Sequence, residues 1–67
     1  MSPESLAGLQ FIASSKRAPT VAAFLEKFTP YGQAVLDSII VSHVDEVKGK
    51  LVLNQAGKAI VEHESKK

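Results

Sequence analysis

The chain has 67 residues, of which 45% are hydrophobic, and a formal net charge of +1. A chain of this length forms one domain close to the lower size limit for folding without a covalent or metal staple. It contains no cysteine, which excludes disulfides and thiolate metal sites, and no apolar run approaches the roughly 18 residues of a membrane span.

The first predicted helix begins at Ser2-Pro3-Glu4, which combines a capping hydroxyl, a proline at the first helical position and an acid in the first turn. An apolar stripe at helical spacing follows, made of Leu6, Leu9, Ile12 and Ala13. Phe11 lies off this stripe. The polar and basic segment 14–17 closes the helix. The same N-terminus lacks the basic and apolar pattern of a signal peptide, so we expect a cytoplasmic protein.

The next two helices are predicted from two similar start signals. Ala18 precedes a proline and must be extended, and Thr20 can then cap a helix from Val21 to about Lys27. Thr29-Pro30 repeats the signal and predicts a third helix from Pro30 to about Ser42. Only three or four residues separate the two helices, which favours a sharp crossing over an antiparallel hairpin.

After His43 the pattern becomes strand-like. Residues 44–47 and 51–53 flank Lys48-Gly49-Lys50, where glycine can supply the positive backbone angle of a tight hairpin. Asn54 then caps a fourth helix that ends at about His63, with Ala56, Ala59 and Ile60 on its inner face. Residues 64–67 are predicted to be a frayed tail. The whole chain, 1–67, is one α+β domain that is mostly α.

Two stretches carry a resemblance to a known superfamily. Residues 21–40 (VAAFLEKFTPYGQAVLDSII) look like two crossing helices, and residues 48–60 (KGKLVLNQAGKAI) look like a wing tip, its returning strand and a capped helix. The order of elements resembles the winged helix-turn-helix superfamily, particularly MarR-type and PadR-type DNA-binding domains. This resemblance implies three helices, a β-hairpin wing and a C-terminal helix. A four-helix or helix-plus-hairpin domain outside this superfamily would show the same amphipathic stripes.

In such proteins the third helix enters the major groove of DNA. Its polar stripe here is Thr29, Gln33 and Asp37, with Tyr31 and Ser38 beside it. Gln33 could read adenine, and Thr29 or Tyr31 could hold a phosphate. Two lysines of the wing could contact the DNA backbone, and three further cations could flank the same face. The candidate cations are Lys48 and Lys50 in the wing, and Lys16, Arg17 and Lys27 elsewhere.

Other features of the same segments oppose DNA binding. Residues 30–42 contain no Arg or Lys, and the carboxylate of Asp37 would repel phosphates. A polar stripe beside a core helix is often only solvated, and lysines at a hairpin tip often only keep a sheet edge soluble. The leading hypothesis is a small transcriptional regulator that binds double-stranded DNA. The alternative is a winged-helix module that binds protein, or a subunit of a larger assembly without direct DNA contact.

Apolar residues outside the predicted stripes suggest a homodimer. The first and last helices of related repressors form the dimer contact, so Phe11 and Val61 are the candidate interface residues. Catalysis has no support, because His43 and His63 do not form a helical metal pair and no serine has a glycine elbow. We therefore expect no enzyme activity, no metal and no cofactor.

Overall fold

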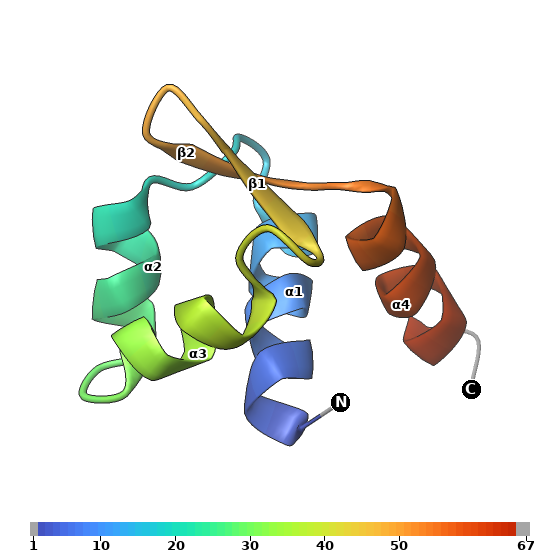
Figure 1. Ribbon diagram of the computed structural model, residues 1–67, viewed down its shortest axis with the longest axis horizontal. Helices are drawn as coiled ribbons and strands as arrows, with labels where there is room; N and C mark the ends of the chain where they lie inside the picture. Colours follow the sequence, from blue (N-terminus) through green and yellow to red (C-terminus); the bar gives the residue numbers. More distant parts are fainter. Residues whose placement is uncertain (1, 66–67) are drawn as a thin grey trace.

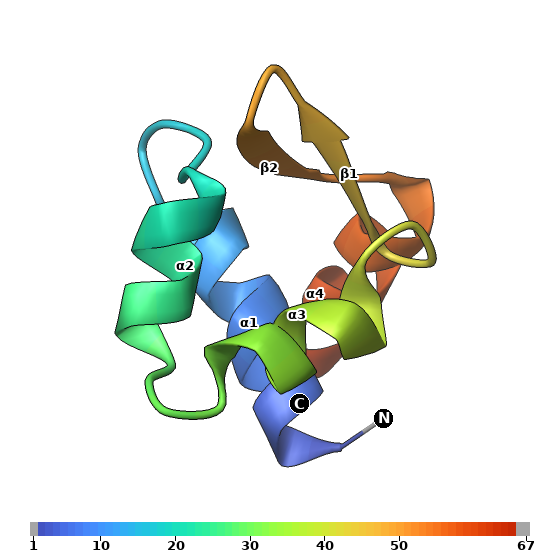
Figure 2. The same ribbon diagram turned by 60° about the vertical axis from the view of Figure 1, so that its left-hand side comes forward.

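The computed structural model describes residues 2–65, which form four helices and one antiparallel hairpin (Figure 1). The fold is α+β and mostly helical. In chain order the elements are α1 (Pro3–Ser14), α2 (Val21–Lys27), α3 (Gly32–Ile39), β1 (Val44–Val47), β2 (Lys50–Leu53) and α4 (Gln55–Ser65). The hairpin covers one end of the helical layer, and α4 packs beside α1 on the side away from α2 (Figures 1 and 2).

The predicted caps of the first two helices are confirmed. The Ser2 hydroxyl accepts a hydrogen bond from the Ser5 backbone N–H at 3.2 Å, and Pro3 occupies the first helical position. The Thr20 hydroxyl accepts from the Ala23 N–H at 3.1 Å. Each side chain satisfies one of the backbone donors that the first turn of a helix leaves without a partner. Local capping chemistry therefore fixes where these helices start.

The prediction that α3 runs from Pro30 to Ser42 with Thr29 as its cap is wrong. Residues 28–30 form a turn that contains a cis Thr29–Pro30 peptide, and the Thr29 hydroxyl donates to the Leu25 carbonyl oxygen at 2.9 Å. Tyr31 holds the cap position without a side-chain bond. The helix then begins at Gly32, where an added β-carbon would lie 2.6 Å from the Leu25 carbonyl oxygen. Glycine is required because α2 and α3 approach so closely.

The hydrophobic core lies where α1, α2 and α3 meet the hairpin. Its fully buried side chains come from five elements and are Leu9, Phe24, Ile39, Val44 and Leu51. Ala13, Ala56 and Ala59 are exposed, which corrects their predicted inward positions. On α1, Leu9 and Ile12 are buried as predicted, and Ser5 and Gly8 are buried beside them. A β-carbon on Gly8 would lie 2.9 Å from the Phe24 ring, so small residues set this packing face.

The hairpin is built as predicted, except that Lys50 already belongs to β2. Val44 pairs with Leu53 and Val47 pairs with Lys50, so the turn residues are Lys48 and Gly49, with φ of 54° and 78°. Two positive φ values are the pattern of a type I′ turn. The segment that enters α2 borders the other edge of β2, because the Leu51 N–H donates to the Pro19 carbonyl and the Val21 N–H donates to the Gly49 carbonyl. The hairpin is therefore anchored beside the start of α2.

The start of α4 is clamped to the loop between α3 and β1. The Asn54 carboxamide oxygen accepts from the Gly57 N–H at 3.0 Å, and its amide group donates to the carbonyls of Val41 and Ser42. A β-carbon on Gly57 would collide with the His43 carbonyl oxygen. The predicted Asn54 cap is thus confirmed, and Gly57 lets α4 approach the backbone of the loop before β1.

The end of α4 lies further along the chain than predicted. The helix continues through Glu64 and Ser65, two residues of the predicted frayed tail. The rest of that predicted tail, 66–67, lies outside the described residues. Within residues 2–65, no helix combines the length and the apolarity that a membrane crossing needs.

Candidate nucleic-acid interface

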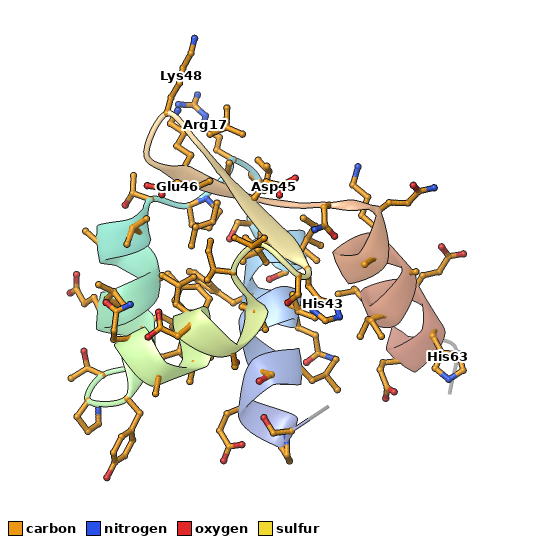
Figure 3. The ribbon with its side chains drawn as sticks, viewed as in Figure 1. Arg17, His43, Asp45, Glu46, Lys48 and His63 are labelled. Atoms are coloured by element: carbon orange, nitrogen blue, oxygen red, sulfur yellow. The ribbon has the colours of Figure 1, made fainter. Side chains whose placement is uncertain are left out.

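Four of the five predicted cations lie near the tip of the hairpin, which we call the wing tip (residues 48–50). Lys48 and Arg17 extend from the same end of the molecule (Figure 3). Arg17 and the neighbouring Lys16 precede the segment 19–21 that borders β2, and Lys50 is the first residue of β2. All four side chains, those of Lys16, Arg17, Lys48 and Lys50, are exposed. The fold thus joins two segments that are more than 30 residues apart into one basic group.

Two acids lie next to this basic group. Asp45 and Glu46 are exposed on β1, and Figure 3 places them below Lys48 along the hairpin. Successive residues of a strand point to opposite faces, so the two carboxylates do not combine on one face of the hairpin. The four cations outnumber these two acids. The wing tip therefore keeps a local positive excess that the whole chain, at +1, barely shows.

Lys48 occupies an unfavourable backbone conformation. Its φ of +54° lies in the left-handed region, which is disfavoured by about 1–2 kcal/mol for most side chains and suits Gly, Asn or Asp. At the neighbouring Gly49, an added β-carbon would meet nothing within 4 Å, so the tip is open. No packing at the tip therefore accounts for a lysine at residue 48.

The other predicted contact residues gather at the opposite end of α2. Lys27 ends α2, and Thr29 and Tyr31 lie in the turn before α3. Seven helical residues span about 10 Å, so this group is separated from the wing tip by roughly that length. In Figure 1 both groups lie on the side of the molecule that α2 forms. Tyr31 is 73% exposed, whereas the hydroxyl proton of Thr29 is already donated to Leu25.

The outer face of α3 is exposed but carries no cation. Gln33, Ala34 and Asp37 lie on this face, and the Gln33 amide donates to an Asp37 carboxylate oxygen at 2.8 Å. Ser38 points its hydroxyl at the Val35 carbonyl, 2.6 Å away. One amide N–H and the carbonyl oxygen of Gln33 remain for a partner, but the adjacent carboxylate opposes a phosphate.

Phe11 and Val61, the candidate dimer residues, are partly buried and pack against the core of the same chain. Phe11 packs edge-on against Phe24 and Phe28, with ring centroids 6.0 and 5.8 Å apart. Val61 also packs against the core. Their role in a dimer stays a prediction. The sequence also places Phe24 and Val41 outside or at the margin of the stripes; Phe24 is fully buried, whereas Val41 is 79% exposed at a φ of +70°.

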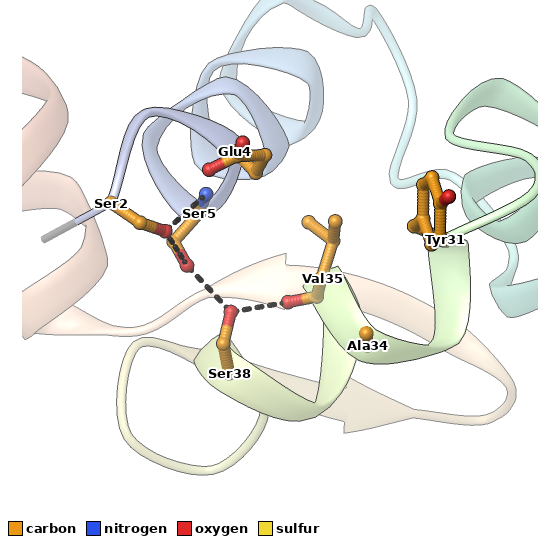
Figure 4. A pocket seen from close by; sticks show the side chains of 7 residues that line it. All are labelled: Ser2, Glu4, Ser5, Tyr31, Ala34, Val35 and Ser38. Atoms are coloured by element: carbon orange, nitrogen blue, oxygen red, sulfur yellow. Dashed lines mark hydrogen bonds between the residues drawn. The ribbon is translucent and has the colours of Figure 1, made fainter.

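A shallow groove between α1 and α3 was not predicted. It is lined by Ser2, Glu4 and Ser5 from the start of α1, and by Tyr31, Ala34, Val35 and Ser38 (Figure 4). Three serine hydroxyls cross it as a chain, and the Ser5 and Ser38 oxygens are 2.6 Å apart. The sequence signal was the serine pair Ser2 and Ser5, of which only Ser2 was interpreted, as a cap. Residues 2–65 contain no group of three or more His, Asp or Glu side chains placed to hold a metal ion.

Comparison of the chain with protein-family models, with curated proteins and with solved structures gives no match. The function is therefore inferred from the sequence and from the geometry of the residues described above.

Proposed function

We propose that this protein binds double-stranded DNA as a winged helix-turn-helix domain and works as a dimeric, cytoplasmic transcriptional regulator. In this proposal the start of α3 enters the major groove with Tyr31 and Gln33. The wing tip contacts the sugar-phosphate backbone through Lys48 and Lys50, with Lys16 and Arg17 beside them. Lys27 and Thr29 contact a second stretch of backbone next to the groove.

The order and pairing of the elements support this fold assignment. A helix, an extended segment, two helices joined by a four-residue turn, a hairpin and a last helix follow one another in the order that the resemblance implies. The segment 19–21, which leads into α2, borders β2 rather than β1, so the hairpin projects next to the pair of crossing helices. A wing in this position can reach DNA on the same side as the start of α3.

The observation that carries the proposal is Lys48 at the wing tip. A lysine with φ of +54° is less stable there than asparagine or glycine would be, and the open tip offers no packing that would compensate. Unfavourable backbone conformations concentrate at positions where the side chain has a function. An exposed ammonium group at the same end of the molecule as Arg17 suits an anionic partner, and regularly spaced phosphates are such a partner.

The test is a titration of a fluorescently labelled duplex at several salt concentrations. Each lysine that contacts a phosphate contributes about 0.9 to the slope of log K against log salt. We expect Lys48→Ala combined with Lys50→Ala to lower that slope by nearly 2 and to weaken binding of every duplex sequence tested. Lys58→Ala, which removes an exposed cation on α4, is the control and should change neither quantity. An unchanged slope in the double variant would remove the wing from the interface.

A second candidate function is a protein-binding module, and Val41 favours it. Its side chain is 79% exposed at a φ of +70°, which is an unfavourable angle for a β-branched residue. The outer face of α3 also has an exposed acid and no cation. In this function a basic surface of a partner protein pairs with Asp37, and the loop at Val41 provides an apolar contact.

A further inference from the structure

The groove between the start of α1 and α3, which we call the α1–α3 groove, has a volume of about 330 Å³. This volume is at the lower end of the range typical for small-molecule sites. Glu4 on α1 and Tyr31 at the start of α3 lie on opposite sides of Val35 (Figure 4). The ring of Tyr31 is seen nearly edge-on in this view, with one face toward Val35. The groove thus has an acidic side, an aromatic side and an apolar floor.

The serine hydroxyls of the groove are already occupied. Ser38 donates to the Val35 carbonyl, so Ser5 must donate to Ser38, and Ser2 donates to Ser5. The oxygen of Ser2 in turn accepts from the Ser5 N–H. This chain of bonds joins α1 to α3 and leaves few polar groups for a ligand. The groove's capacity for specific binding therefore comes from Glu4, Tyr31 and the apolar floor.

The charge among the residues that line the α1–α3 groove is negative. Glu4 is exposed, and its carboxylate is the charged group among the residues that line the groove. No Lys, Arg or His of the described residues 2–65 lines it. The face of a tyrosine ring attracts cations through its quadrupole, and a carboxylate adds direct attraction. Ala34 and Val35 offer apolar contact between the two. An anion of the same size would meet repulsion from Glu4, and no cationic side chain among the described lining residues would offset it.

We propose that the α1–α3 groove binds a small organic cation, namely an ammonium group that carries an aromatic or alkyl substituent. The ammonium group lies between the Glu4 carboxylate and the Tyr31 ring. The substituent covers Ala34 and Val35. None of the lining residues belongs to the hairpin, so the site does not depend on the wing. Tyr31 is also one of the proposed DNA contacts, so a bound cation would occupy a side chain that the duplex uses.

The experiment is a titration of the ¹⁵N-labelled full chain with benzyltrimethylammonium, followed by amide chemical shifts. Benzenesulfonate, an anion of similar shape, is the matched ligand control. We expect saturable shifts at Ser5, Val35 and Ser38 with the cation and none there with the anion. Equal responses to both ligands, shifts confined to other parts of the chain, or no response to the cation at millimolar concentration would each overturn the proposal.

Variants then test the two binding groups. Glu4→Gln keeps the size of the side chain and should raise the dissociation constant about three- to fivefold, as expected for an exposed charge pair. Tyr31→Leu keeps apolar bulk without the ring face and should weaken binding by a similar factor. Glu26→Gln, which neutralises an exposed acid on α2 outside the groove, should have no effect. If Glu26→Gln weakens binding as much as Glu4→Gln, only the net charge matters and the assigned site is wrong.

Discussion

The wing tip and the start of α3 are two exposed regions at opposite ends of α2, and they differ in both packing and charge. At the wing tip a β-carbon on Gly49 would meet nothing within 4 Å, whereas one on Gly32 would meet the backbone of Leu25. The wing tip has Lys48 and Lys50, whereas α3 has no cation at all. One region is free of packing constraints and basic, and the other is tightly packed and neutral to acidic.

This difference shows which residues can be interpreted as functional. At the start of α3 the residue types follow from packing, since glycine is needed for close approach and the Thr29 hydroxyl binds the Leu25 carbonyl. At the wing tip packing dictates nothing, so Lys48 at a positive φ needs another explanation. The proposal for DNA binding therefore depends on the wing tip, and α3 contributes mainly its shape and the exposed Tyr31.

The largest effect that follows from this comparison is on stability. Gly32→Ala should lower the free energy of unfolding by about 2 kcal/mol, because the new methyl group forces α2 and α3 apart. Gly49→Ala meets no atoms and should lose only about 1 kcal/mol, from its φ of +78°. Urea unfolding of both variants measures the difference. An equal or larger loss for Gly49→Ala would contradict the contrast between an open wing tip and a packed start of α3.

A smaller effect is expected on the outer face of α3, and it separates the two candidate functions. Asp37→Lys replaces a repelling carboxylate with a cation, so duplex affinity at low salt should rise about tenfold if α3 faces DNA. Glu62→Lys makes the same change of charge on the exposed side of α4 and should have much less effect. Equal gains from both variants would mean that α3 does not face the duplex. If α3 binds a basic protein surface, Asp37→Lys instead abolishes that complex.

Much of the fold could be predicted from the sequence because local chemistry determines it. Ser2, Thr20 and Asn54 are caps whose side chains bond to nearby backbone, and Gly49 marks a turn. The start of α3 could not be predicted in this way. Thr29-Pro30 has the composition of a helix start, but the Thr29 hydroxyl turns back to α2. The start of α3 at Gly32 instead goes with the close packing of Gly32 against the Leu25 backbone, which is a contact between two helices.

The inner faces of α1 and α4 were predicted only in part: Leu9 and Ile12 are buried and Ile60 packs against the core, but the predicted alanines are exposed. Apolar periodicity also selected Ala13, Ala56 and Ala59, whereas close contacts of α1 are made through Gly8 and Ser5, which carry no apolar signal. In the candidate site, too, some residues could be predicted from the sequence and other features could not. Exposed Lys48 and Tyr31 could be selected from the sequence, whereas the pairing of Gln33 with Asp37 and the α1–α3 groove require the relative placement of side chains and helices.

The smallest expected effect gives the most direct test of the claim that Lys48 is a binding residue at a strained position. Asn-Gly is the preferred pair for a type I′ turn, so Lys48→Asn should raise the free energy of unfolding by about 0.5–1 kcal/mol. The same variant should bind duplex less tightly, with the salt slope lowered by about 1. The free energy of unfolding and the duplex affinity should be measured on the same preparation of this variant. Higher stability with weaker duplex binding is the predicted result, and higher stability with unchanged binding would contradict it.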